Sequence, residues 1–264
     1  MKEITLRQMQ MIELDMLIAF DAVCKKHGLR YYLDGGTLLG AMCYEGFIPW
    51  DDDIDLKMPR PDYERFLQLQ SELPAHIRID APRREHCEYT MTKLIDDRTV
   101  LIERSGNREK TTGVYIDILP MDGHPEEDAV CQAHIRKLQR LNSLFHHSLE
   151  GFAGVKSWKK HIYRLLYTPW GLYRRLTETA KSVDYDSADH VGLLIEGDPV
   201  RECFPKQWLE PAVQLEFEGH FFPAPVGYKP HMELFYGPHV TKEEHYHNLP
   251  QYPAAHNHEV FWKE

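Results

Sequence analysis

The segment Trp50-Asp51-Asp52-Asp53-Ile54-Asp55-Leu56-Lys57-Met58 places four carboxylates within five positions, directly ahead of an apolar run. Residues two apart on a strand share a face, so Asp53 and Asp55 are predicted to point together while Ile54 points into the core. Carboxylates this close repel one another unless protons or a cation compensate them. The segment therefore predicts a half-buried strand that carries two oxygen ligands, with Asp51 and Asp52 as accessory acids. The alternative is an exposed acidic turn that caps the following helix.

Oxygen ligands without thiolates suit Mg²⁺, with Mn²⁺ as a possible substitute. Mg²⁺ takes one or two carboxylates and completes its shell with water and substrate phosphates, so a phosphorylated substrate is expected. A third carboxylate should come from a neighbouring strand, and Asp117 lies between β-branched residues in the segment 115–119. The alternative for Asp117 is a buried acid satisfied by backbone donors. Asp122, just beyond Pro120, is predicted to be a turn residue.

A glycine pair precedes the acidic segment. Residues 31–33 read as a short strand, Asp34-Gly35-Gly36-Thr37 as a tight turn, and residues 38–43 as the start of a helix. Because glycine lacks a side chain, backbone N–H groups at such a turn can approach a phosphate beside a helix N-terminus. The alternative is a turn with no ligand.

The rest of the chain alternates helical and strand patterns. Residues 4–27 form an amphipathic pattern that Gly28 should end, and Pro61 should open another helix. Strand patterns lie at 76–80, 89–95, 99–103, 114–119 and 212–222, whereas 125–200 keeps helical spacing. The predicted fold class is α+β: one domain, 1–264, with a mixed sheet flanked by helices and a helical insertion at 125–200.

Composition narrows the function. No apolar run approaches the ~20 residues that cross a bilayer, and the N-terminus lacks the pattern of a signal peptide, so a cytoplasmic protein is expected. The formal charge of −10 disfavours nucleic-acid binding. Between Lys156 and Lys181, however, seven basic residues and one acid are interleaved with aromatic residues. Basic helices with aromatic residues favour contact with an anionic membrane surface, here its inner face, or with an anionic polymer. The alternative is an ordinary solvated helix face.

Neither cysteine nor histidine spacing predicts a clear metal site. The five cysteines are scattered without a C-x-x-C pair, which argues against both a disulfide framework and a cysteine zinc site. Near the C-terminus, the pairs His245/His247 and His256/His258 could ligate zinc, but no thiolate or carboxylate partner is evident in the sequence.

The order strand, Gly-Gly-Thr, helix and Asp-Ile-Asp resembles the nucleotidyltransferase superfamily of the polymerase-β type. More closely, residues from about 30 to 255 resemble the LicD phosphocholine transferases, which share this core with fukutin and fukutin-related proteins. The 125–200 insertion matches least well. The matching stretches are Tyr32-Leu33-Asp34-Gly35-Gly36-Thr37-Leu38-Leu39-Gly40, Gly46-Phe47-Ile48-Pro49-Trp50-Asp51-Asp52-Asp53-Ile54-Asp55, Lys93-Leu94-Ile95-Asp96 with Thr99, Asp117-Ile118-Leu119-Pro120-Met121-Asp122-Gly123, Tyr236-Gly237 and Leu249-Pro250.

The resemblance implies transfer of phosphocholine from CDP-choline, or of a related group from another CDP-alcohol, to a hydroxyl of a cell-surface glycan that is linked to a membrane. Carried over by position, Asp53, Asp55 and Asp117 would hold the metal. The phosphates of the donor would meet Gly35, Gly36, Thr37 and Lys93, and Asp117 could also accept the proton of the sugar hydroxyl.

Three other functions remain open at this point. A true nucleotidyltransferase would leave the nucleotide on its acceptor and release pyrophosphate. A glycosyltransferase would use the acid pair for a sugar nucleotide, although the glycine turn argues against it. A binding module without activity would not need the intact acids.

Overall fold

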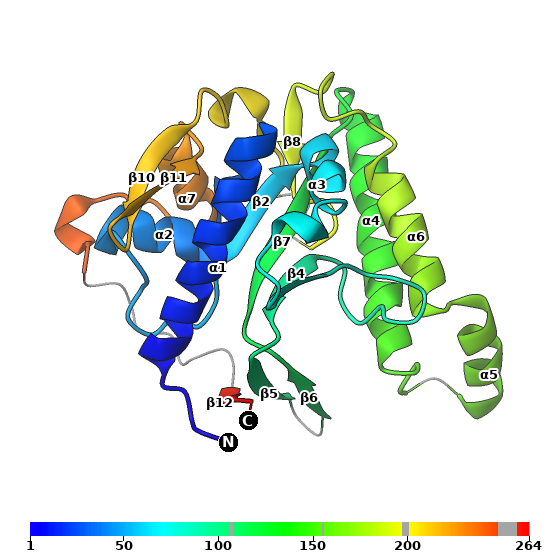
Figure 1. The fold of residues 1–264 in the computed structure, drawn as a ribbon. Coiled ribbons are helices and arrows are strands. Elements are labelled where there is room, and N and C mark those ends of the chain that lie inside the picture. Colours follow the sequence, from blue (N-terminus) through cyan, green and yellow to red (C-terminus); the bar gives the residue numbers. More distant parts are fainter. Residues whose placement is uncertain (106–107, 155, 197–200, 248–257, 264) are drawn as a thin grey trace. The chain divides into compact units, whose positions relative to one another are not determined.

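A computed structural model describes residues 1–105, 108–154, 156–196, 201–247 and 258–263. The fold is α+β, as predicted, and combines helices with a mixed sheet (Figure 1). The chain forms two compact units: unit 1 comprises residues 1–80, 93–119 and 207–264, and unit 2 comprises 81–92 and 120–206. The predicted insertion at 125–200 falls inside unit 2. All the acids proposed for the site fall inside unit 1.

Helix α1 (Leu6–His27) opens unit 1 where the sequence predicted a helix. The side chain of Thr5 accepts a hydrogen bond from the backbone of Gln8, whose own side chain accepts from the backbone of Thr5, so the helix begins with a capping box. Gly28 adopts the left-handed conformation at φ 60° and ends the helix. One long face of α1, including Met16, Leu17 and Phe20, is buried in the core of unit 1.

The main sheet has the strand order β1-β2-β7-β4-β3, with β1 (Tyr32–Leu33), β2 (Asp55–Pro59), β7 (Tyr115–Gly123), β4 (Thr92–Asp96) and β3 (Ile77–Asp80). Strand β1 pairs antiparallel with β2, with Leu33 opposite Leu56. The predicted alternation of β2 is wrong, because residues 56–59 are all buried. Strand β2 lies between β1 and β7 and is covered on both faces, which removes the alternation of a half-exposed strand.

Two helices flank β2 along the chain. Helix α2 (Gly35–Tyr44) begins at Gly35 itself, so the predicted glycine turn is the first turn of this helix. Helix α3 (Arg60–Phe66) follows β2 and carries Pro61 in its first turn, as predicted. The strand predicted at 212–222 is instead a hairpin of β10 (Val213–Phe217) and β11 (His220–Ala224). Its turn contains Glu218 and Gly219, both at positive φ.

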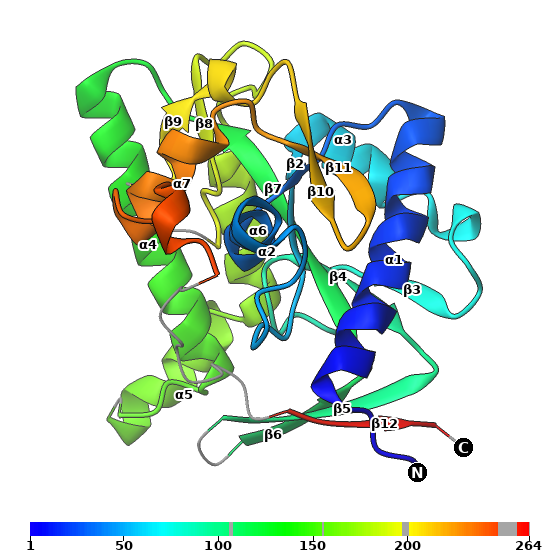
Figure 2. The same cartoon turned by 90° about the vertical axis from the view of Figure 1, so that its left-hand side faces the viewer.

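A second, three-stranded sheet holds the two chain ends together in unit 1 (Figure 2). Its order is β12-β5-β6, formed by β12 (His258–Trp262), β5 (Thr99–Ser105) and β6 (Arg108–Thr112). The N–H of Ile4 donates to the carbonyl of Val260 at 2.8 Å. Helix α7 (Tyr228–Tyr236) also belongs to unit 1 and buries Met232 and His231.

Unit 2 is mainly helical. It contains α4 (Asp128–Leu149), α5 (Ser157–Leu166) and α6 (Pro169–Ala180), together with the short strands β8 (His190–Gly192) and β9 (Phe204–Pro205). Helices α4 and α6 pack side by side over a core that includes Leu138 and Leu176 (Figure 1). Asp122 is not a turn residue: it lies in β7, 1% exposed, and pairs with Gly192 of β8. Among the described residues, no helix combines the length and apolar character needed to span a membrane.

Candidate active site

The acidic segment folds into a compact group of carboxylates in unit 1. Oxygen atoms of Asp51, Asp52 and Asp53 all lie within 4.8 Å of one another. Asp55 stands next, at the start of β2. Its pKa is raised well above the usual range, first by burial and then by the charges of Asp53 and Asp117. The structure thus brings the predicted acids together, and their mutual repulsion raises the pKa of Asp55.

The glycine pair is required by contact with these acids. A Cβ atom on Gly35 would lie 2.7 Å from Oδ2 of Asp55, and one on Gly36 would lie 2.6 Å from Oδ2 of Asp51. Gly35 also has φ +50°, a conformation that L side chains rarely adopt. The hydroxyl of Thr37 accepts a hydrogen bond of 2.9 Å from the N–H of Asp55. The N-terminus of α2 therefore faces the carboxylates, where its dipole favours negative charge.

Glu13 of α1 is a site residue that sequence reasoning missed. Its side chain is 0% exposed, and neither carboxylate oxygen has a hydrogen-bond partner. Its pKa is raised well above the usual range, first by burial and then by Asp53, Asp52, Asp51 and Asp117 in that order. One turn earlier, Gln10 donates from Nε2 to the carbonyl of Asp51 at 2.9 Å. The sequence did contain a sign of this role, because Glu13 is an acid that lies beside Met9, Ile12 and Met16 on the apolar face of α1.

Asp117 and Lys93, which were predicted separately, form a buried ion pair. Nζ of Lys93 donates to the two carboxylate oxygens of Asp117 at 2.7 and 3.0 Å. The same ammonium group lies 3.3 Å from the centre of the Tyr115 ring. The N–H of Asp117 donates to the carbonyl of Ile54 at 2.8 Å, which fixes β7 against the acidic segment. Asp117 is thereby placed beside the cluster with its carboxylate oriented by Lys93.

A second buried group lies behind the glycine turn. Lys57 is 0% exposed, and its Nζ lies 2.7 Å from Oδ1 of Asp34 and 2.8 Å from Nε2 of His231. Burial alone would raise the pKa of Asp34, but the charge of Lys57, together with His231, holds it below its usual range. Because Asp34 precedes Gly35 and Lys57 follows Asp55, this group ties α2, β2 and α7 together behind the site.

The C-terminal strand also reaches the acidic segment. Nδ1 of His258 lies 3.1 Å from Oδ2 of Asp52, and its Nε2 lies 4.0 Å from Oε1 of Glu103. Burial would lower the pKa of His258, but Asp52 and Glu103 outweigh it and raise the pKa to about 9. In this structure the ring of His258 lies beside two carboxylates, and zinc binding by the pair His256/His258 stays a prediction. His256, the other member of this pair in the sequence, lies outside the described residues, as do Leu249 and Pro250.

The donor set suits a hard divalent cation. Every acid in the group offers oxygen only, and the group includes Glu13, a fully buried carboxyl whose oxygens have no partner. Holding several carboxylates this close together is costly, most of all for the buried carboxyl of Glu13, and a bound cation would relieve both desolvation and repulsion. Asp53 and Asp55 would hold Mg²⁺, with Asp51, Asp52, Glu13 and Asp117 around them.

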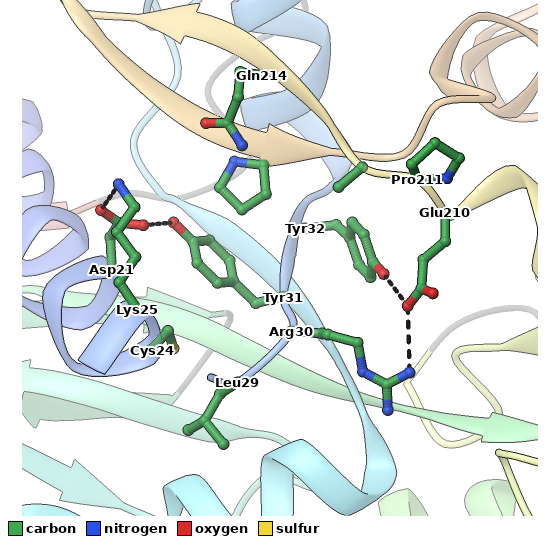
Figure 3. Close-up of a pocket in the computed structure, with 12 residues that line it drawn as sticks. Asp21, Cys24, Lys25, Leu29, Arg30, Tyr31, Tyr32, Glu210, Pro211 and Gln214 are labelled. Carbon is green, nitrogen blue, oxygen red and sulfur yellow. Dashed lines mark hydrogen bonds and ion pairs between the residues drawn. The ribbon is translucent and has the colours of Figure 1, made fainter. Parts of the chain in front are cut away.

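A pocket of about 430 Å³ lies elsewhere in unit 1, between α1, β1 and residues 210–214 (Figure 3). Tyr31 and Tyr32 project to opposite sides of the chain in this view. The hydroxyl of Tyr31 donates to Asp21 at 2.8 Å, and that of Tyr32 donates to Glu210 at 3.2 Å. Both acids are already engaged, and none of the predicted site residues lines this pocket.

Comparison with known proteins places this site in a family. Residues 28–142, which include both the glycine turn and all the predicted acids, match the profile described as "LicD/FKTN/FKRP, nucleotidyltransferase domain". The chain is 30% identical over 246 residues to the lipopolysaccharide cholinephosphotransferase LicD of Haemophilus influenzae, covering 90% of this chain and 92% of that protein. It is also 24% identical over 227 residues to the ribitol 5-phosphate transferase FKRP of Mus musculus, covering 86% of this chain and 31% of that protein. The chain belongs to the LicD family.

Proposed function

We propose that this protein transfers phosphocholine from CDP-choline to a hydroxyl of a cell-surface glycan and releases CMP, with Mg²⁺ held by Asp53 and Asp55. The observation that carries the proposal is the convergence of the acids on the N-terminus of α2, where Gly35 and Gly36 leave no room for side chains. Similarity to the LicD cholinephosphotransferase over 90% of the chain supports the choice of the transferred group.

The reaction replaces the phosphoanhydride bond of CDP-choline with a phosphodiester bond to the acceptor. The acceptor hydroxyl attacks the phosphorus that bears choline, the bond from that phosphorus to the CMP oxygen breaks, and CMP leaves. When bound, Mg²⁺ would neutralise charge on the phosphate oxygens. The hydroxyl proton passes to Asp117, whose carboxylate Lys93 orients. Backbone N–H groups at the start of α2, exposed by the two glycines, would bind phosphate oxygens of the donor.

The name of one relative favours a second donor. The mouse protein FKRP, which matches 86% of this chain, is named a ribitol 5-phosphate transferase. CDP-ribitol is therefore the second candidate, since the same acids would serve any CDP-alcohol and only the pocket for the head group would differ. CDP-ethanolamine and CDP-glycerol complete the set to be compared.

The decisive experiment measures CMP release from the four CDP-alcohols with a crude surface-glycan extract and Mg²⁺. We expect CMP from CDP-choline, a product mass increased by one phosphocholine, and at least a ~100-fold loss in Asp53→Asn, since that variant removes a charge that the phosphoryl transfer requires. Asp15→Asn, an exposed acid on α1 outside the site, is the matched control and should retain activity. Nucleotidylated glycan with release of pyrophosphate would instead contradict the proposal.

We also propose that α5 attaches the enzyme to the anionic membrane surface that carries its acceptor. Its apolar side chains Trp158, Ile162, Leu165 and Leu166 are 63%, 47%, 81% and 59% exposed. Their spacing of four, three and one places them along one helix face. Lys156, Lys159, Lys160 and Arg164 supply positive charge on and beside the helix. An apolar face rimmed by basic residues complements an anionic lipid surface.

Sedimentation with vesicles tests this attachment. We expect binding to vesicles that contain phosphatidylglycerol, weaker binding in high salt, and little binding to pure phosphatidylcholine. Leu165→Ser should reduce binding strongly, whereas Val130→Ser, which changes an exposed valine of α4, should not. Concentration-dependent dimers that require Leu165, with no vesicle binding, would show that a second copy covers this face and would overturn the proposal.

A further inference from the structure

Three segments of unit 2 bring metal-ligating side chains together, far along the chain from the acidic segment. His124 follows the end of β7, Cys131 lies in the first turns of α4, and Cys203 directly precedes β9. One ligand atom from each lies within 4.8 Å of the others. Both cysteines are free thiols. Seventy-one residues separate Cys131 from Cys203, which is why the spacing of cysteines in the sequence gave no sign of this cluster.

The geometry matches the coordination shell of zinc. Sγ of Cys131 lies 3.7 Å from Nδ1 of His124. A tetrahedral zinc ion with bonds of about 2.3 Å to sulfur and about 2.0 Å to nitrogen separates those two ligands by about 3.5 Å. The backbone of His124 is fixed, because its N–H donates to the carbonyl of His190 at 2.8 Å. The ligand atoms therefore already stand close to the spacing that a bound zinc ion requires.

A candidate for the fourth ligand lies on the same helix, outside the group of three residues whose ligand atoms lie within 4.8 Å of one another. His134 lies three residues after Cys131, so the two side chains occupy the same face of α4. Nε2 of His134 is buried and has no hydrogen-bond partner, and Nε2 of His124 is in the same condition. Buried ring nitrogens without partners are costly to maintain, and metal binding at one ring nitrogen commonly orients the other.

We propose that His124, Cys131 and Cys203, with His134 as the fourth ligand, form a structural zinc site in unit 2. Thiolate and imidazole ligands select zinc over magnesium, so this site is distinct in chemistry from the all-oxygen group of unit 1. Binding displaces the two thiol protons to solvent and forms two Zn–S bonds and two Zn–N bonds. The ion would link the two ends of the long segment between β7 and β9 and would hold the start of α4 against those ends. The proposal departs from the expectation, drawn from the cysteine spacing, that the cysteines form no zinc site.

Metal analysis of the wild-type chain tests the site without any substitution. We expect one zinc per chain after purification without chelator. Replacement by Co²⁺ should give the thiolate-to-cobalt charge-transfer absorption that oxygen ligands cannot produce. Of the five cysteines, two should become protected from a thiol reagent when zinc is added. The absence of stoichiometric zinc and of the cobalt–thiolate band, or a disulfide between Cys131 and Cys203 in the zinc-treated protein, would overturn the proposal.

Variants then assign the ligands. Cys131→Ala, Cys203→Ala and His124→Ala should each lose stoichiometric zinc, and His134→Ala should bind it at least tenfold more weakly. Cys87→Ala, which changes a buried cysteine of the same unit outside the cluster, is the matched control and should bind zinc as the wild type does. Equal zinc affinity in Cys131→Ala and the wild type would refute the site. Because Asp53→Asn should leave zinc binding intact, failure of this proposal and failure of the transferase proposal are distinguishable.

Discussion

Glu13 lies inside unit 1 with neither carboxylate oxygen partnered and with acids as its charged neighbours. Its pKa in the folded protein is well above the value of about 4.3 expected in the unfolded chain. Below pH 4, the carboxyl of Glu13 is protonated in both the folded and the unfolded protein, so it does not lower the stability. As the pH rises, the unfolded state releases its proton first, and the metal-free protein therefore loses stability.

This loss of stability with rising pH gives the first prediction. In EDTA, the free energy of unfolding should fall between pH 5 and pH 8, and Mg²⁺ should restore much of the loss. Glu13→Gln should flatten the pH dependence, because its amide has no proton to release. Urea unfolding at the two pH values measures the effect, and Asp15→Asn on the exposed face of α1 is the control. An equal slope in Glu13→Gln and the wild type would contradict the assignment of Glu13 to the acidic group.

The ion pair of Asp34 and Lys57 gives a second prediction at this scale. Asp34→Ala should destabilise the protein by about 3–5 kcal/mol, because it leaves the ammonium of Lys57 buried and uncompensated. The exposed pair of Arg174 and Glu178 provides the comparison, and Glu178→Ala should cost less than about 1 kcal/mol. The pKa of Asp34 is lowered, so its contribution is present above about pH 4 and is lost as the pH falls further. Denaturant titration of both variants measures the difference.

At the scale of elements, the approach of α2 to the acidic segment depends on Gly36. A Cβ there would meet Oδ2 of Asp51 at 2.6 Å, so Gly36→Ala must displace either the helix or the acid. We expect CMP release to fall at least tenfold, with stability nearly unchanged. Gly219→Ala is the comparison that tests backbone strain without a steric clash, because Gly219 has φ +77° but open space around it. It should cost about 1 kcal/mol of stability and leave activity intact. Full activity in Gly36→Ala would show that the close approach is dispensable.

Strand β12 is attached to the acidic segment through His258, whose pKa of about 9 is above its unfolded value of about 6.5. The stabilising contact is complete below pH 6.5 and is lost as the pH rises through 9. Between pH 7 and pH 10, the wild type should therefore lose more stability than His258→Gln. Thermal unfolding in EDTA at the two pH values checks this, and identical losses would exclude a charged pair between His258 and Asp52.

At the scale of the whole molecule, the two units should respond to different metals. Mg²⁺ should slow amide hydrogen exchange in α1, α2 and β2 of unit 1, since ligand binding stabilises the state that binds. Zinc should instead slow exchange around residues 124–134 and 203–205 of unit 2. Mass-spectrometric exchange with each metal in turn separates these effects. Protection of unit 2 by Mg²⁺ alone would contradict the division of the two sites.

Local sequence was sufficient for several parts of the molecule. Helix α1 and its stop at Gly28, the start of α3 at Pro61 and the strands near 77–80 and 99–105 follow from patterns within a few residues. The hairpin at 213–224 was not predicted, because residues on both sides of Glu218 and Gly219 have a strand pattern and the segment was taken as one strand. The prediction that buried and exposed residues alternate along β2 was wrong, because neighbouring strands and helices bury both of its faces, and the residues of β2 alone do not indicate this.

By itself the sequence predicted the acids and the glycines of the candidate site, because they lie within short motifs whose spacing is typical of a strand, a turn and a helix, while Lys93 followed from the family resemblance. Only the tertiary structure decided that Glu13 and His258 reach the acidic segment, that Lys93 pairs with Asp117, and that His124 meets Cys131 and Cys203. Local patterns specify which elements form, whereas contacts between distant residues depend on how those elements pack, and no short-range pattern encodes that packing.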